Sequence, residues 1–194
     1  MIHAPAVAAL VRAFSDPSDG EAAKSRELIL LLLEQAPEPF SRHNYEPGHI
    51  TCSGLVLAPD CERILLVHHR RLDRWLLPGG HVEPDDPEIW DSARREVVEE
   101  TGAILVPDSS FTALVSVDVH GIPVHAKRRE PYHLHHDLTF SFQAVSEEFQ
   151  ISEESRDAVW CAPSAFDHYD IPGNIRRTYA RVQGARVRKL SSSR

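Results

Sequence analysis

Cysteine and long hydrophobic runs are both scarce in this chain. Cys52, Cys61 and Cys161 are scattered, odd in number and without CxxC spacing, which argues against a disulfide framework or a thiolate zinc site and fits a reducing compartment. The longest aliphatic run, Leu28 to Leu33, is far too short to span a bilayer. Met1 to Phe14 lacks the basic start and long apolar run of a signal peptide. We therefore expect a soluble cytoplasmic protein that does not bind membranes.

Positive charge is also in short supply. The chain has 21 Lys and Arg against 29 Asp and Glu, which gives a formal net charge of −8. Long nucleic acids bind non-specifically to basic faces, so we expect no such partner. A small polyanionic substrate remains compatible, because bound cations reverse the local sign of charge. With 194 residues, the chain can bury one good core and carry an appended element.

The first 46 residues predict two helices. Apolar residues recur at helical spacing in two segments, about residues 4–15 and 21–35, and the polar stretch 16–20 breaks the pattern. A leucine-rich face requires a cover, so we interpret residues 1–46 as a helical extension docked on a main domain of residues 47–190. The residues at core spacing are Val7, Leu10, Val11 and Phe14 in the first helix, and Leu28, Leu31 and Leu32 in the second.

From residue 47 onward the pattern changes to short runs rich in leucine or β-branched residues, which are typical of strands. One helix midway and another at the end of the chain complete an α/β fold, an α/β/α sandwich of mixed sheets. The expected strands are 51–58, 63–69, 111–120, 134–145 and 158–161, with a short one at 75–77, and the expected helices are 87–101 and 171–188.

Three carboxylates lie at i, i+3 and i+4 of the midway helix: Glu96, Glu99 and Glu100. Residues at this spacing share one helical face, where like charges repel slightly. A bound Mg²⁺ removes that cost, because it prefers oxygen ligands and commonly joins carboxylates to substrate phosphates. A glutamate triplet alone is more often a solvated acidic face, so the flanking residues decide between the two interpretations.

Those flanking residues are Trp75 to Glu83 before the helix and Arg95 to Ala103 within and after it. Together they resemble the Nudix box, which is a glycine, a spaced glutamate and then REUxEExGU with U aliphatic. The closing part matches at every fixed residue. The loop before the helix is one residue longer than in the family, so either Asp86 or Glu88 takes the place of the spaced glutamate.

The resemblance implies a Mg²⁺-dependent hydrolase, with Mn²⁺ as a possible substitute, that cleaves the diphosphate linkage of a nucleoside diphosphate derivative. Candidate substrates are nucleotide sugars, ADP-ribose, dinucleoside polyphosphates and modified nucleoside triphosphates. An alternative is a non-catalytic Nudix-fold sensor of a nucleotide metabolite, but the intact glutamate triplet favours catalysis. Family members often form homodimers, so a homodimer is also expected.

By the same resemblance, Glu96, Glu99, Glu100 and the carbonyl of Gly80 are the metal ligands. Arg95 orients the carboxylates, and Glu96, Glu99 and Arg95 form the catalytic group. The base that takes a proton from water stays open between these glutamates and acids of a later loop. Those loop acids are Glu147, Glu148, Glu153 and Glu154.

Four further residues are candidates for substrate binding. Arg70 and Arg74 lie in a basic segment before the glycine turn, and arginine suits bidentate contacts with phosphate. His133 and His135 belong to a histidine-rich stretch, residues 120–137, in which they share a strand face with Asp137. Such a face either contacts substrate or ligates a transition metal. The loop of residues 120–131 is long enough to act as a substrate-specific flap.

Overall fold

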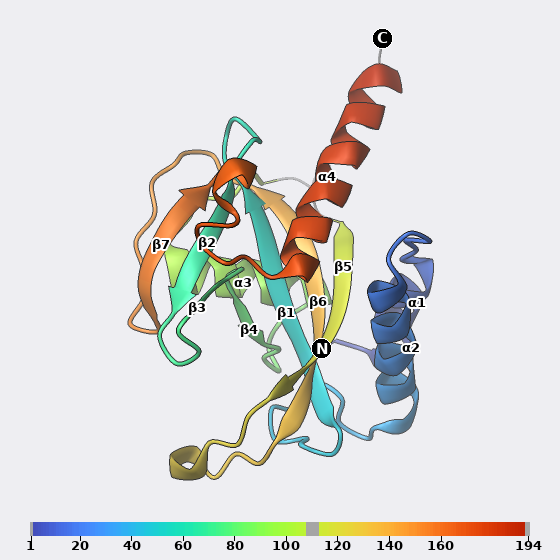
Figure 1. Cartoon of the computed structure of the whole chain (residues 1–194). Coiled ribbons are helices and arrows are strands. Elements are labelled where there is room, and N and C mark those ends of the chain that lie inside the picture. The colour runs from blue at the N-terminus through green and yellow to red at the C-terminus, as the bar shows by residue number, and fades with distance from the viewer. Residues whose placement is uncertain (1, 108–112, 193–194) are drawn as a thin grey trace. The chain divides into compact units, whose positions relative to one another are not determined.

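A computed structural model describes residues 2–107 and 113–192. These residues form four α-helices, two short 3-10 helices and seven strands (Figure 1). The expected α/β class with an N-terminal helical region is confirmed. The helices are α1 (Ala4–Ala13), α2 (Gly20–Gln35), α3 (Ile89–Thr101), α4 (Gly173–Ser192), η1 (Ala126–Arg128) and η2 (Pro163–Ala165). The strands are β1 (Gly48–Leu57), β2 (Ile64–His69), β3 (Arg74–Leu76), β4 (Gly79–His81), β5 (Leu114–Ile122), β6 (His133–Gln143) and β7 (Ser155–Cys161).

The strands form one sheet in the order β3-β2-β1-β6-β5, with β4 paired to β1 and β7 paired to β2. By spatial proximity the chain divides into two compact units, and β1, α3, β5 and β6 each contribute residues to both. The first unit comprises Met1–Ser53, Gly79–Glu96 and Ser116–Phe140, and the second comprises Gly54–Pro78, Val97–Val115 and Ser141–Arg194.

In the first unit, α1 and α2 lie side by side (Figure 1). The carboxylate of Asp19 caps α2 by accepting a hydrogen bond from the backbone N–H of Ala22 at 3.1 Å. Arg26 closes the end of α1, donating to the carbonyls of Val11 at 3.2 Å and Arg12 at 2.9 Å. The carbonyl of Val11 also accepts from the N–H of Phe14, the C-cap of α1, at 3.2 Å. By bonding to carbonyls of the last turn of α1, Arg26 fixes the two helices to each other.

The face that α2 buries differs from the expected one. Leu28 and Leu31 are 45% and 48% exposed, whereas Ile29 is fully buried and Leu32 and Leu33 are nearly so. The expectation was wrong for Leu28 and Leu31. In a run of six aliphatic residues, composition alone does not show which helical face turns inward, and here Ile29, Leu32 and Leu33 share that face.

The second unit has its own hydrophobic core. The turn after β1 is closed by the N–H of Ala58 bonding to the carbonyl of Arg63 at 2.9 Å, as the sequence predicts for a β-hairpin. Helix α4 contributes Ile175 and Val182 to this core, at the spacing of one helical face. The buried residues of the core are Leu55, Leu57, Cys61, Ile64, Leu66, Cys161, Phe166, Ile171, Ile175 and Val182. All three cysteines of the chain are buried free thiols.

Helix α3 begins two residues after the predicted start, at Ile89. The N–H of Glu88 donates to the carboxylate of Asp91 at 3.2 Å, a side-chain bond that caps the first turn. At the other end Gly102 adopts a positive φ of 60°, and its N–H bonds to the carbonyl of Val98 at 2.8 Å. A glycine takes this left-handed conformation without strain, so the predicted helix end is confirmed.

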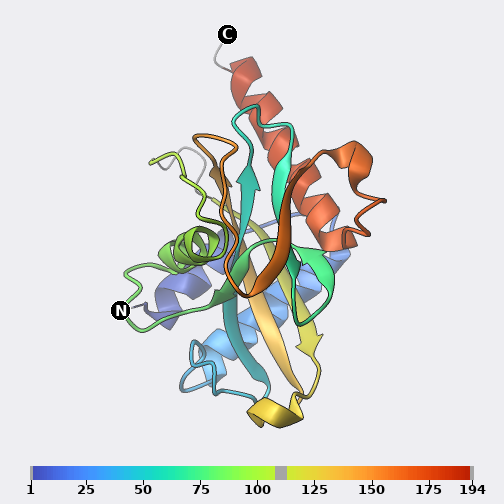
Figure 2. The same cartoon turned by 90° about the vertical axis from the view of Figure 1, so that its left-hand side faces the viewer.

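The connection after β5 is shorter than the predicted flap. Strand β5 extends to Ile122, so the start of the predicted loop 120–131 is strand, and the turn is built around η1 (Figure 2). The first residues of the strand predicted at 111–120, Phe111 and Thr112, lie outside the described residues. Among the residues that the structure describes, no helix has the length and apolarity needed to cross a membrane.

Candidate functional site

The glycine turn places backbone directly against a carboxylate of α3. Strand β4 pairs with β1, with Gly80 opposite Cys52 and His81 opposite Thr51. A Cβ atom built on Gly80 would lie 2.6 to 2.7 Å from the Glu96 carboxyl group, which is closer than a carbon atom can approach. A larger residue here would therefore displace the Glu96 carboxylate, whereas the absent side chain of Gly80 lets that carboxylate lie against the backbone of the turn.

Arg95 holds this arrangement together. Its Nε and Nη2 lie 3.1 Å from the two oxygens of Asp86, its Nη1 lies 2.9 Å from Oε1 of Glu96, and Nη2 also donates to the carbonyl of His81 at 2.8 Å. One guanidinium thus joins the loop, the helix and β4. Of the two candidates for the spaced glutamate, Asp86 makes this pair, whereas Glu88 is exposed.

The carboxyl group of Asp86 is strongly stabilised as an anion. Burial by itself raises its pKa, but hydrogen bonds from Arg95, the N–H of Glu83 and the hydroxyl of Ser92 outweigh burial, and the net shift of the pKa is downward. The Ser92 hydroxyl donates to it at 2.7 Å. Asp86 is therefore a fixed negative charge that anchors Arg95.

The three glutamates differ in exposure along α3. The Glu96 side chain is 15% exposed and Glu99 is exposed, but Glu100 is only 5% exposed. The downstream loop covers the end of the helix, because the N–H groups of Gln150 and Ser152 donate to the carbonyls of Thr101 at 2.7 Å and Glu100 at 3.0 Å. The interpretation of the triplet as a solvated acidic face is therefore wrong at Glu100, the residue that this loop covers.

The same loop carries the acids considered as a base. Glu147 already pairs with Arg63, at 2.7 Å and 2.9 Å, and the Arg63 guanidinium lowers the pKa of its carboxyl group. Glu153 and Glu154 are exposed, and their carbonyls accept from Arg70, at 2.9 Å from the side chain and 3.1 Å from the backbone N–H. Arg70 thus anchors the loop that closes the end of α3.

Arg74, His133 and His135, the other predicted substrate-binding residues, belong to different units of the chain. Arg74 is exposed at the first position of β3, opposite His69. His133 is only 4% exposed, and its Nδ1 lies 2.9 Å from the carbonyl of Pro131. His135 is half-buried. Arg70 and Arg74 belong to the second unit and the two histidines to the first.

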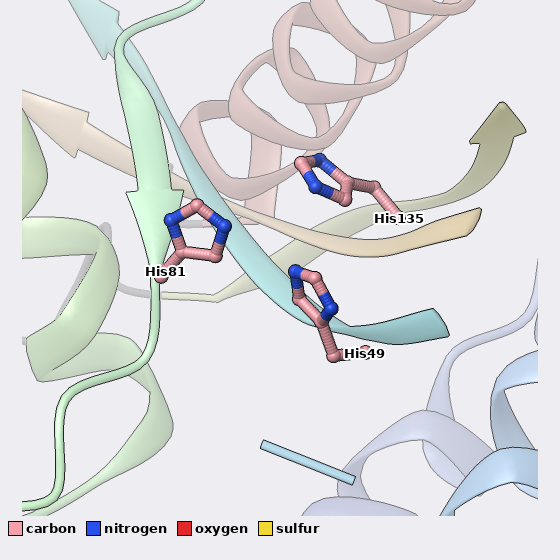
Figure 3. A group of neighbouring side chains, drawn as sticks. All are labelled: His49, His81 and His135. Atoms are coloured by element: carbon pink, nitrogen blue, oxygen red, sulfur yellow. The ribbon is translucent and has the colours of Figure 1, made fainter. Parts of the chain in front are cut away.

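Three histidines from separate strands meet in the first unit: His49, His81 and His135, named here the histidine group (Figure 3). One ring nitrogen from each can be chosen so that the three lie within 4.8 Å of one another. The ring centroid of His49 is 5.1 Å from that of His81 and 4.9 Å from that of His135. Gly48 permits this approach, because a Cβ there would lie 1.8 Å from the carbonyl oxygen of Leu134.

Side chains alternate between the two faces of β1 and β6, and this alternation explains why the face that carries the histidine group is polar. The hydroxyls of Thr51 and Ser53 on β1 both donate to Asp137 at 3.0 Å, and burial raises the pKa of that carboxyl group. Since side chains two apart share a face, His49 and His135 lie on the same surface as these groups. The strand pattern predicted a shared face for His135 and Asp137, but His49 was not predicted to join them. A visible signal was its period-two spacing with Thr51 and Ser53.

Burial keeps two members of the histidine group uncharged. Desolvation lowers the pKa of His49 to about 4 and that of His135 to about 2, with the neighbouring histidines adding to the latter effect. Both imidazoles are therefore neutral at pH 7. His133 stacks on His49 with ring centroids 5.1 Å apart, and this contact helps to hold the His49 ring in place.

Known proteins resemble this chain over the region that builds both sites. Residues 48–182 match the NUDIX domain. The "Probable DHNTP pyrophosphohydrolase" of Lactococcus lactis subsp. cremoris is 30% identical over 125 residues, covering 64% of this chain and 72% of that protein. The "Putative 8-oxo-dGTP diphosphatase" of Bacillus subtilis is 25% identical over 123 residues, covering 63% and 73%.

Solved structures agree on the fold. A NUDIX hydrolase from Nitrosomonas europaea superposes with a TM-score of 0.52 at 19% identity, covering 70% of this chain and 88% of that one. An Ap4A hydrolase binary complex from C. elegans gives 0.51 at 14% identity, covering 71% and 97%. Because the NUDIX domain match spans well over half of the sequence and includes the turn and helix described above, the chain belongs to the Nudix family and is a Nudix-type pyrophosphohydrolase.

Proposed function

We propose that the protein uses Mg²⁺, with Mn²⁺ as a substitute, to hydrolyse the diphosphate linkage of a nucleoside diphosphate derivative. The observation that carries this proposal is the Glu96 carboxylate, seated on the backbone of Gly80 and held by Arg95. The relatives whose names specify DHNTP and 8-oxo-dGTP make modified triphosphates the first substrates to test. Nucleotide sugars, ADP-ribose and dinucleoside polyphosphates follow.

The residues at this site suit a magnesium ion. Mg²⁺ prefers oxygen donors and is usually held by one or two carboxylates together with substrate phosphates. Glu96, Glu99 and Glu100, with the carbonyl of Gly80, would supply these oxygens, and a side chain at Gly80 would fill the space beside Glu96. When bound, the ion lowers the pKa of water and neutralises charge on the phosphoryl oxygens.

The protein's own groups position the reaction. Arg95 fixes the carboxylate of Glu96, and the anion of Asp86 fixes Arg95. The base that accepts a proton from the attacking water is one of the acids Glu96, Glu99, Glu147, Glu148, Glu153 and Glu154. Glu147 is the weakest candidate, because Arg63 holds its carboxylate and makes it less basic. In this proposal Arg70 and Arg74 attract the substrate phosphates.

A substrate panel tests the function. Purified protein is incubated with each candidate in Mg²⁺, in Mn²⁺ and in EDTA, and the products are separated by ion-exchange chromatography. We expect cleavage within the diphosphate linkage of one class, supported by either metal and abolished by EDTA. The sensor alternative predicts instead that calorimetry detects binding of a panel compound while no product forms. That outcome, or turnover that persists in EDTA, would contradict the proposal.

Three broader expectations remain predictions. A cytoplasmic location and a homodimer follow from the composition and from the family resemblance, and sedimentation velocity measures the oligomeric state. The third is the division of the chain into a helical extension, residues 1–46, and a catalytic domain, residues 47–190.

A further inference from the structure

Among the residues that the structure describes, the histidine group is a cluster of side chains able to ligate a metal whose chemistry the proposed function does not use. Its members come from β1, β4 and β6, which are distant in sequence, yet their ring nitrogens converge to within 4.8 Å. Figure 3 shows the three rings turned toward one another. Imidazole is a preferred ligand of zinc and other late first-row transition metals.

His49 carries an atom that requires a partner. The residue is 1% exposed, and its Nδ1 lies 3.1 Å from the carbonyl oxygen of Asn44. A carbonyl only accepts, so Nδ1 carries the proton and Nε2 of the neutral ring presents a lone pair. That Nε2 is buried and has no hydrogen-bond partner. A buried nitrogen in this state costs free energy unless a donor or a metal ion meets it.

The hydrogen bond to Asn44 also prepares His49 as a ligand. Metal-bound histidines usually donate their second ring N–H to a carbonyl or carboxylate, which fixes both the tautomer and the ring orientation. Such a bond is already present here. Its neighbour His133 stacks on the ring at 5.1 Å, and this contact limits rotation of His49.

We propose that His49, His81 and His135 bind one transition-metal ion, with Zn²⁺ as the best fit, at a site separate from the carboxylates of α3. Zinc–nitrogen bonds of about 2.0–2.1 Å in a tetrahedron place the ligand atoms roughly 3.4 Å apart. One ring nitrogen of each histidine lies within 4.8 Å of the others, so each pair of ligand atoms closes by at most about 1.4 Å on binding. Three protein ligands leave one position for water or a substrate oxygen, as in catalytic zinc sites.

The position of His81 links this site to the proposed active site. It directly follows Gly80, which rests against Glu96, and its own carbonyl accepts from Arg95 at 2.8 Å. An ion on the histidine group would therefore steady the strand that carries the glycine turn. The metal is expected to contribute to substrate binding or stability while the α3 carboxylates supply the hydrolytic site.

Metal binding is measured directly, without reference to turnover. Full-length protein is stripped with EDTA, desalted and titrated with ZnCl₂ by calorimetry, and CoCl₂ serves as a spectroscopic probe of nitrogen ligation in the visible range. We expect one Zn²⁺ per chain and a higher melting temperature with zinc. His81→Ala and His135→Ala should each weaken binding by about 100-fold or more, since outer-shell partners alone are worth roughly 10- to 100-fold.

Two matched variants locate the ion. His168→Ala removes an exposed histidine of the second unit and should leave zinc binding unchanged. Glu99→Gln should also retain zinc, because it alters only the carboxylate site. His81→Gln keeps a polar side chain, and its metal-free melting temperature shows whether the fold is intact. Absence of zinc binding by the wild type, equal binding by the His81 and His135 variants, or loss of zinc in Glu99→Gln would each overturn the proposal.

Discussion

Arg95 and Asp86 form a bidentate ion pair, in which Nε and Nη2 each lie 3.1 Å from a different carboxylate oxygen. The flat guanidinium matches the two oxygens of a carboxylate, and an ammonium group cannot reproduce this fork. The remaining Nη1 reaches Glu96 at 2.9 Å. Arg95 therefore links Asp86 in the loop before α3 to Glu96, so the position of Asp86 fixes the position of the Glu96 carboxylate beside Gly80.

Arg95→Lys tests this positioning role. We expect kcat to fall by about 10- to 100-fold, which is typical of lost outer-shell partners, and the Mg²⁺ concentration for half-maximal rate to rise, with little change in KM. Arg94→Lys, an exposed neighbour on the same helix, is the matched control and should behave as wild type. An unchanged magnesium dependence in Arg95→Lys would show that Arg95 has a structural role only.

Gly80→Ala tests the close approach of backbone and carboxylate. The new Cβ would sit 2.6 to 2.7 Å from the Glu96 carboxyl group, so we expect the carboxylate to move and turnover to fall by orders of magnitude. Gly20→Ala places its Cβ in open space and should retain full activity. Steady-state kinetics of both variants at saturating Mg²⁺ decide the matter, and equal rates would refute the packing argument.

Glu99→Gln and Glu100→Gln separate metal binding from folding. Both should lose turnover by orders of magnitude, because each removes a charge that neutralises the metal. Glu99 is exposed, so its variant should melt with the wild type, whereas Glu100 is 5% exposed and its variant should melt at a lower temperature. Activity of both variants within a few-fold of wild type would exclude these residues as metal ligands.

Deleting residues 1–40 tests whether the helical extension is part of the folded core. The Oγ of Ser25 accepts a hydrogen bond from the N–H of Val119 at 3.1 Å, and the carbonyl of Pro39 accepts from Ile50 at 2.8 Å. We expect the truncated protein to melt earlier and aggregate, while its folded fraction still hydrolyses substrate. Equal melting temperature, solubility and oligomeric state would show instead that the extension is dispensable.

A pair of point variants checks the same idea within one helix. Ile29→Ala removes a fully buried side chain and should lower the free energy of unfolding by about 2–5 kcal/mol. Leu28→Ala alters a side chain that is 45% exposed and should change it by about 0.5 kcal/mol or less. Urea denaturation of both variants measures the difference. A larger effect at Leu28 would indicate that another surface covers it.

The sequence predicts most of the elements but only part of the sites. The helix that carries Glu96 was predictable, because its apolar spacing, its glycine end and the glutamate spacing all agree. The histidine group was not, since it depends on the pairing of β4 with β1, which local patterns do not encode. The burial of Glu100 likewise depends on a loop that meets the helix from about 50 residues further along the chain.

The three buried cysteines have a practical consequence. Burial raises the pKa of the Cys52 and Cys161 thiols, and Cys61 is only 5% exposed, so all three should react slowly with maleimides and other thiol reagents. In the folded protein, the native cysteines should therefore take up little of a thiol-reactive label. Val124 in the β5–β6 connection is 65% exposed, so a single cysteine introduced there would carry a fluorophore or spin label at one defined position. Such a label would make movements of the β5–β6 connection during turnover directly observable.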